Sequence, residues 1–238
     1  MKKPMKTAGE LMAELNKNPE YVARQREAAE RTHRNVEDYQ RAAAPLMAEL
    51  AAAGFVVANV SELYQKRINY ERAVPILVKW LPMMANPRVK ESIVRALSVP
   101  FAQQAAPLLI EEFRRVDPDQ GGLKWAIGSA LDVVANDAVL DEMIGLATDK
   151  SHGKAREMVV AGLGNMSDRR VVPILIDLLR DEVVFVNAMM GLAKLGATAA
   201  RSSIQPFLKH PKSYVRKEAQ KAIEKIDKAG GPPGGPLH

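Results

Sequence analysis

The chain has 238 residues, of which 47% are hydrophobic and 26% charged, a balance typical of a folded protein that excludes wholesale disorder. Its net charge of +6 comes from the two ends of the chain, because residues 71–208 carry equal numbers of basic and acidic side chains. A neutral middle argues against binding along a nucleic acid, which requires many cations spread along one groove. The absence of cysteine excludes disulfides, thiolate nucleophiles and cysteine metal sites.

The beginning of the chain is basic, as in a signal peptide. Glu10 and Glu14 nevertheless interrupt any apolar core of the length that secretion needs. No uncharged apolar run approaches the roughly 20 residues that span a bilayer. We therefore expect a cytoplasmic protein that makes no membrane contact.

Residues 1–70 are predicted to form an N-terminal helical cap. Thr7 and Glu10 have the spacing of a capping box before a short helix, which ends at Asn18 and Pro19. A long, highly charged helix follows from Glu20 to about residue 53. Its narrow uncharged seam can pack on one neighbour only, so we expect this helix to cover the first repeat. The alternative is that it is a dimerising helix. The seam consists of Val22, Ala29, Val36, Tyr39, Ala43 and Leu46.

One pattern of apolar and small residues occurs five times between residues 89 and 223. Each copy starts with an apolar residue and continues with apolar or small residues four, seven and eight positions later, offsets that share one side of a helix. A unit of about 30 residues cannot bury such a stripe alone and needs a similar neighbour stacked on it. The copies start at Val89, Leu123, Ala155, Val184 and Val215.

A first helix precedes each of these second helices, and three of the first helices carry a proline near their start, at Pro75, Pro107 and Pro173. The sequence therefore predicts an all-α, right-handed solenoid of five helix pairs over residues 71–228. Residues 229–238 are rich in Gly and Pro and are expected to form a flexible tail. The predicted pairs span residues 71–101, 102–136, 137–166, 167–196 and 197–228.

The last two units resemble the HEAT repeat family. Residues 171–179, with the sequence VVPILIDLL, are similar to the first helix of that repeat, and residues 214–223, YVRKEAQKAI, to the second. The resemblance covers residues 71–228 and implies an α-solenoid. It leaves the activity open, because the family contains mostly scaffolds and adaptors but also phycobilin lyases and some DNA glycosylases.

The side of each second helix opposite the core stripe is expected to line the concave surface of the solenoid. In the middle repeats this side is apolar, and exposed contiguous apolar surface marks interaction sites. Methionine suits an adaptable groove and tryptophan is a frequent anchor of binding energy. The predicted strip consists of Trp125, Val160, Val186, Met189 and Met190, with Lys217 and Lys221 at one end to steer acidic residues.

We interpret the chain as a non-catalytic scaffold or adaptor, a monomer or homodimer, that binds a helix or peptide of a partner protein in this groove. Three alternatives remain for the strip: the N-terminal helices cover it, a second copy of the chain covers it, or the register is shifted so that Met189 lies in the core. The alternative for the function is a solenoid enzyme or binder that acts on a nucleic acid or a tetrapyrrole. Trp125, Asp132 and Arg156 could be imagined as the site of such a glycosylase.

No catalytic residue, metal or cofactor is predicted. Basic residues follow the first core position of four second helices, and in similar HEAT repeats this position binds loop acids or carbonyl groups, so we expect a structural role for it. They are Lys90, Lys124, Arg156 and Arg216, and Phe185 occupies the position in the fourth repeat.

The remaining motifs are also interpreted structurally. The four histidines lack ligand spacing, Asp117 and Asp119 are read as turn residues rather than a calcium loop, and Gly162 and Gly164 are read as helix packing rather than a dinucleotide fingerprint.

Overall fold

A computed structural model describes residues 6–66, 68–117 and 122–230, and every regular element in these ranges is helical. No helix in the described ranges is both long and apolar enough to cross a bilayer. The α-helices, with short 3₁₀ turns before several of them, are α1 (Ala8–Leu15), α2 (Pro19–Ala52), α3 (Glu62–Gln65), α4 (Val74–Trp80), α5 (Pro87–Leu97), α6 (Ala106–Arg115), α7 (Gly122–Val134), α8 (Leu140–Thr148), α9 (Arg156–Leu163), α10 (Val171–Leu178), α11 (Phe185–Lys194), α12 (Arg201–Ile204) and α13 (Ser213–Gly230).

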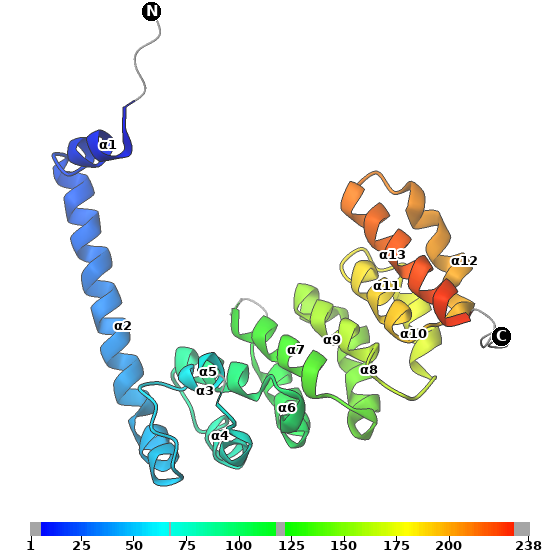
Figure 1. Ribbon diagram of the computed structural model, residues 1–238, viewed down its shortest axis with the longest axis horizontal. Coiled ribbons are helices and arrows are strands. Elements are labelled where there is room, and N and C mark those ends of the chain that lie inside the picture. Colours follow the sequence, from blue (N-terminus) through cyan, green and yellow to red (C-terminus); the bar gives the residue numbers. More distant parts are fainter. Residues whose placement is uncertain (1–5, 67, 118–121, 231–238) are drawn as a thin grey trace, which may run out of the picture.

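From α4 onward the helices lie in two rows that follow the order of the chain. The even-numbered helices α4 to α12 form one row and the odd-numbered helices α5 to α13 form the other (Figure 1). Each helix of the odd row contacts the next one, α5 with α7, α7 with α9, α9 with α11 and α11 with α13. The core therefore runs between the rows, and the odd row presents its opposite side to solvent.

The ends of these helices follow local sequence signals. Asn86 caps α5 by accepting hydrogen bonds from the N–H groups of Arg88 and Val89, and Pro87 occupies the first turn, where its missing N–H has no helical partner. The capping box predicted at Thr7 and Glu10 is confirmed at the start of α1. At the other end, α13 continues through Gly230, so the prediction of a flexible tail is wrong for residues 229 and 230; its residues 231–238 lie outside the described part of the chain.

The long N-terminal helix packs on the rest of the molecule with only its C-terminal part. Ala43, Leu46 and Leu50 are buried, and α2 contacts α4 and α5. Glu49 strengthens this contact by accepting hydrogen bonds from the Lys79 ammonium group at 2.8 Å and from the Trp80 indole at 2.7 Å. This carboxylate joins α2 to α4 because both donors lie on α4.

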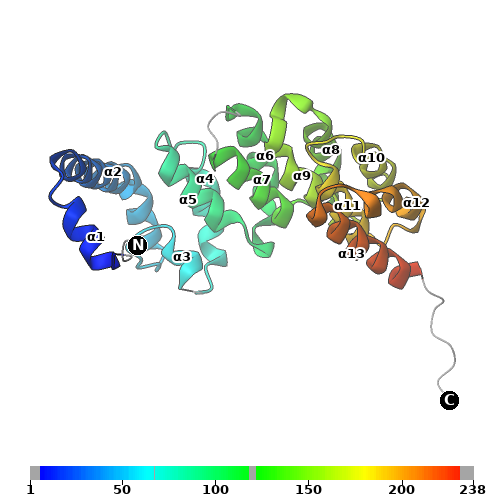
Figure 2. The same ribbon diagram turned by 90° about the horizontal axis from the view of Figure 1, so that it is seen from above.

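The N-terminal part of α2 and all of α1 extend beyond one end of the two rows (Figures 1 and 2). Val36, at the middle of the predicted seam, is half-exposed, and α1 has no buried residue. The seam therefore packs on its neighbour over only part of its length. The two views place α1 and α2 at the end of the odd row, not over α7, α9 and α11.

Glycines allow α9 to approach both of its neighbours in the odd row, α7 and α11, closely. A Cβ atom added to Gly164 would lie 2.5 Å from the Cα atom of Gly191, and one added to Gly162 would lie 3.1 Å from the Cα atom of Asp132. Backbone atoms cannot move aside as the end of a side chain can. The interpretation of Gly162 and Gly164 as helix-packing residues is confirmed.

We expect Gly164→Ala to lower the free energy of unfolding by about 1–3 kcal/mol, because the new methyl group must push α9 and α11 apart. Chemical denaturation followed by circular dichroism measures this loss. Gly145→Ala is the matched control, since nothing lies within 4 Å of a Cβ at that exposed position of α8. The control is expected to raise stability by about 0.5–1 kcal/mol, because alanine favours a helix over glycine. Equal effects of the two changes would contradict the packing role.

Candidate functional site on the second helices

The core stripe predicted for the second helices is confirmed on α5, α7, α9, α11 and α13. The residues four, seven and eight positions after each start are all buried, and four of the five starting residues are buried as well. Ala155, which starts the third copy, is only partly buried. The stripe faces the even-numbered helices, which fixes the side of each second helix that remains for binding.

Two residues of the predicted apolar strip are in the core, which makes the prediction wrong for them. Val160 and Met189 are fully buried, and both lie five positions after the start of their repeat. The equivalent Val94 and Gly128 are buried too, whereas Gln220 on the last helix is exposed. The reason is that this position faces the next helix of the odd row, as Gly128 on α7 faces Met158 on α9, and α13 is the last helix that the structure describes. Met189 therefore lies in the core, although the stripe keeps its predicted register, because one further position beside the stripe is buried.

The strip is also not continuous. Trp125 on α7 is 44% exposed and Met190 on α11 is 41% exposed. Between these helices lies α9, where the equivalent residues are the partly buried Glu157 and the buried Ala161. An acidic side chain and a buried methyl group separate the two exposed apolar side chains, so Trp125 does not extend the surface around Met190.

A smaller site remains between α11 and α13. An open hollow of about 200 Å³ is lined by Met190, Ala193, Lys194, Glu218, Lys221, Ala222 and Lys225. Val186 lies one turn before Met190 and is partly buried. We call these residues the Met190 site and include Lys217, which lies one turn before Lys221 on α13. It combines one exposed apolar side chain with a cationic rim.

Part of the positive charge around the Met190 site is already paired within the protein. Lys221 lies 2.8 Å from a carboxylate oxygen of Glu218, and Lys194 lies 3.2 Å from one of Asp132. Lys217 and Lys225 are exposed, and neither forms an ion pair with a residue that the structure describes. Lys217 and Lys221 were predicted from the sequence to belong to the site, whereas Lys225 was not. The helical spacing of four residues from Lys221 was the signal that could have found it.

The row of basic residues has the structural role that the sequence analysis expected. The Lys90 ammonium group lies 2.6 Å from a carboxylate oxygen of the buried Glu112, and that of Lys124 donates to the carbonyl of Val116 at 2.6 Å. Burial lowers the pKa of Lys124, although the nearby Asp117 and Asp149 oppose this shift. Each of these two lysines thus binds a buried group, Lys124 within its own helix pair and Lys90 in the next pair.

Arg156 is the most deeply engaged member of this row. Its guanidinium group is buried and donates to the carbonyl of Ala147 at 3.0 Å, to that of Gly153 at 3.3 Å and to the Asp181 carboxylate at 3.0 Å. Desolvation alone would raise the pKa of Asp181, but hydrogen bonds from the Val183 N–H and from Arg156 outweigh it and hold that pKa below 3.8. Arg156 therefore ties together α8, α9 and the loop before α11.

The imagined glycosylase constellation does not form an accessible site. Arg156 is buried and fully engaged, and Asp132 accepts hydrogen bonds from Asn165 and Lys194. Only Trp125 of the three is largely exposed. Within the described ranges, no group of three or more acidic or histidine side chains is placed to hold a metal ion.

A structure that is helical throughout the described ranges, in which successive second helices contact one another, is that of a helical repeat protein. Residues 155–181 match the PBS lyase HEAT-like repeat. The match spans the second helix of one pair and the first helix of the next, α9 and α10. It supports the assignment of the chain to the HEAT-like repeat family. A comparison with curated proteins found no significant match.

Proposed function

We propose that the chain is a right-handed solenoid of five HEAT-like repeats that acts as a non-catalytic scaffold or adaptor in the cytoplasm. The order of contacts along the odd row and the repeat match at residues 155–181 support this architecture. The five helix pairs correspond to α4–α5, α6–α7, α8–α9, α10–α11 and α12–α13, with α1–α3 as the N-terminal extension.

We further propose that the Met190 site holds a segment of a partner protein that is apolar on one side and acidic on the other. The observation that carries this proposal is an exposed methionine beside a hollow with a lysine rim. An apolar side chain of the partner would contact Met190, where burial of both adds affinity. Carboxylates on its flanks would meet Lys217 and Lys225, whose charges no acidic residue of the described chain neutralises.

The triple variant Met190→Asp, Lys217→Glu and Lys225→Glu tests this proposal. We expect it to fold as the parent does, because all three residues are exposed, and to lose at least tenfold in partner capture, because it removes the apolar contact and reverses the charge. Capture from the native host followed by quantitative mass spectrometry measures the loss for each protein retained. Lys154→Glu with Lys209→Glu is the control, since both residues are exposed outside the Met190 site. Equal capture by the parent, the control and the triple variant would refute the site.

The second candidate function is tetrapyrrole chemistry. The matched repeat is named after a lyase, which favours this candidate. Incubation of the purified protein with a free bilin tests it. A visible absorption band that stays with the protein through denaturing electrophoresis would support this function over the scaffold function.

A further inference from the structure

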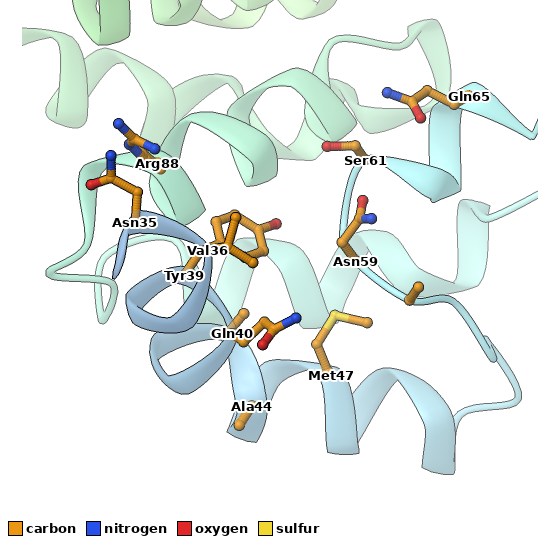
Figure 3. A pocket seen from close by; sticks show the side chains of 12 residues that line it. Asn35, Val36, Tyr39, Gln40, Ala44, Met47, Asn59, Ser61, Gln65 and Arg88 are labelled. Carbon is orange, nitrogen blue, oxygen red and sulfur yellow. The ribbon is translucent and has the colours of Figure 1, made fainter. Parts of the chain in front are cut away.

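A hollow of about 720 Å³ lies where α2 leaves the rest of the molecule (Figure 3). One wall is the stretch of α2 from Asn35 to Met47, and the opposite wall is formed by residues between Ala58 and Gln65 together with Arg88 at the start of α5. Its volume is in the range of sites that hold small ligands or a few peptide residues. It is separate from the Met190 site, which lies between α11 and α13.

The hydroxyl group of Tyr39 is the first sign that this hollow has an occupant. Its oxygen atom is buried but has no hydrogen-bond partner in the described chain. The ring lies beside Val36, and the hydroxyl points towards the wall that carries Asn59 and Ser61 (Figure 3). A buried hydroxyl without a partner lowers stability, and a phenylalanine would fill the same volume without that cost.

The amide side chains that line the hollow also have no hydrogen-bond partner among the described residues. Asn35, Gln40, Asn59 and Gln65 line the hollow, and none of them makes a side-chain hydrogen bond to another described residue. Four asparagines outside the hollow, each at a helix start, accept hydrogen bonds from backbone N–H groups through their side chains. These are Asn18, Asn69, Asn86 and Asn136. Four free amides in one hollow offer both donors and acceptors, as peptide groups require.

Arg88 supplies the only charge among the side chains that line the hollow. Its guanidinium group forms no ion pair with any residue that the structure describes. Val36, which is 49% exposed, and Met47, which packs against the core, give the lining of the hollow an apolar part. The hollow therefore presents one cation, several neutral hydrogen-bonding groups and an apolar surface.

We propose that this hollow binds the carboxyl-terminal end of an extended peptide from a partner protein. Arg88 would pair with the terminal carboxylate in a bidentate geometry. The amides would bind the peptide groups that precede it, and the Tyr39 hydroxyl, whose oxygen solvent does not reach in the free protein, would join them after a turn of its side chain. An apolar terminal side chain would lie on Val36 and Met47. The end of an extended chain fits this hollow better than an acidic helix does. In a helix the peptide groups are hydrogen-bonded to one another, so they could not bind the free amides of the hollow.

The first test needs no ligand. Tyr39→Phe is expected to raise the melting temperature of the full-length protein by about 2 °C or more, because it removes a buried hydroxyl that has no partner. Differential scanning calorimetry of the parent and the variant measures this shift. A melting temperature that falls would show that the hydroxyl is satisfied in the free protein, and the proposal would be overturned.

In the second test, the protein is titrated with the tetrapeptide Ala-Ala-Ala-Leu, which has a free carboxylate. Binding is observed through the NMR signals of the side-chain amides of Asn35, Asn59 and Gln65. We expect these signals to move with the free acid, and the affinity to fall at least tenfold when the peptide is amidated at its C-terminus, because the charge-assisted pair is lost. An amidated peptide with an internal Asp in place of the third Ala tests whether a side-chain carboxylate serves as well. If it binds equally, the chain-end proposal is wrong.

Arg88→Gln should lower the affinity for the free-acid peptide to the affinity for the amidated peptide. Tyr39→Phe should lower the affinities for both peptides by the same factor. Arg72→Gln, at another exposed arginine, is the control and should bind as the parent does. Binding unaffected by Arg88→Gln, or the absence of any signal shift up to millimolar peptide, would overturn the proposal. Neither outcome would bear on the Met190 site.

Discussion

Met189→Asp is expected to unfold the C-terminal part of the chain. Met189 is fully buried and belongs to the continuous apolar core. Replacing it removes a large apolar side chain, which costs about 2–5 kcal/mol, and places a carboxylate where no cation can reach it. The combined loss exceeds about 5 kcal/mol, which is comparable to the whole stability of a small domain.

The neighbouring residue provides the matched control. Met190 is 41% exposed, so the same substitution there should change the free energy of unfolding by no more than about 0.5 kcal/mol. Circular dichroism and limited proteolysis of both variants measure the difference. Because repeats are stabilised mainly by their nearest neighbours, cleavage of Met189→Asp should begin between α10 and α13. Similar stability of the two variants would show that the register described for α11 is wrong.

Arg156→Ala has the second largest expected effect, a loss of about 3–5 kcal/mol. The change leaves the buried carbonyl of Ala147 without its donor and leaves the carboxylate of Asp181, whose side chain is only 10% exposed, without its cation. Removing one member of a buried ion pair is costly because the other must remain charged without compensation. Urea denaturation at neutral pH measures the loss.

The control is Arg170→Ala. Arg170 also pairs with two aspartates, Asp141 and Asp168, but its side chain is 62% exposed, so solvent screens the pairs and the expected loss is about 0–1 kcal/mol. A loss as large as that of Arg156→Ala would mean that burial does not decide the strength of these pairs.

The contribution of Arg156 should also depend on pH in a defined direction. The pKa of Asp181 is lower in the folded chain than its ordinary value of 3.8, so the folded state favours the ionised carboxylate. That stabilisation is present above the unfolded pKa and is lost as the pH falls through the folded pKa. The difference in stability between the parent and Arg156→Ala should therefore be constant near neutral pH and shrink below about pH 4.

The core of the repeats could be predicted from the sequence because a helix with a period of 3.6 residues fixes which positions share a side. Ile93, Ile127 and Val159 were all placed in the core by spacing alone, and all are buried. The structural role of Lys124 and Arg156 was also foreseeable from the resemblance, since in similar HEAT repeats this position binds loop acids or carbonyl groups, and both kinds of partner occur here.

The binding surface was predicted less well, because spacing within one helix does not say how closely the next helix approaches. Val160 and Met189 were assigned to the exposed side, but each faces a neighbour in the odd row. Gly164 and Gly191 bring two of these helices so close that Ala161 and Ala193 are buried as well. On α13, the last helix that the structure describes, Gln220 is exposed at the same position.

The sequence by itself therefore determined that the described chain is helical and which stripe of each second helix is buried. These properties depend on residues a few positions apart, whose relation is set by the geometry of one helix. Only the tertiary structure decided that the apolar strip divides into Trp125 and the Met190 site, and that Tyr39 and Arg88 share a hollow. Those relations join residues of different helices, and they depend on the separation and direction of the helices, which no spacing along the chain records.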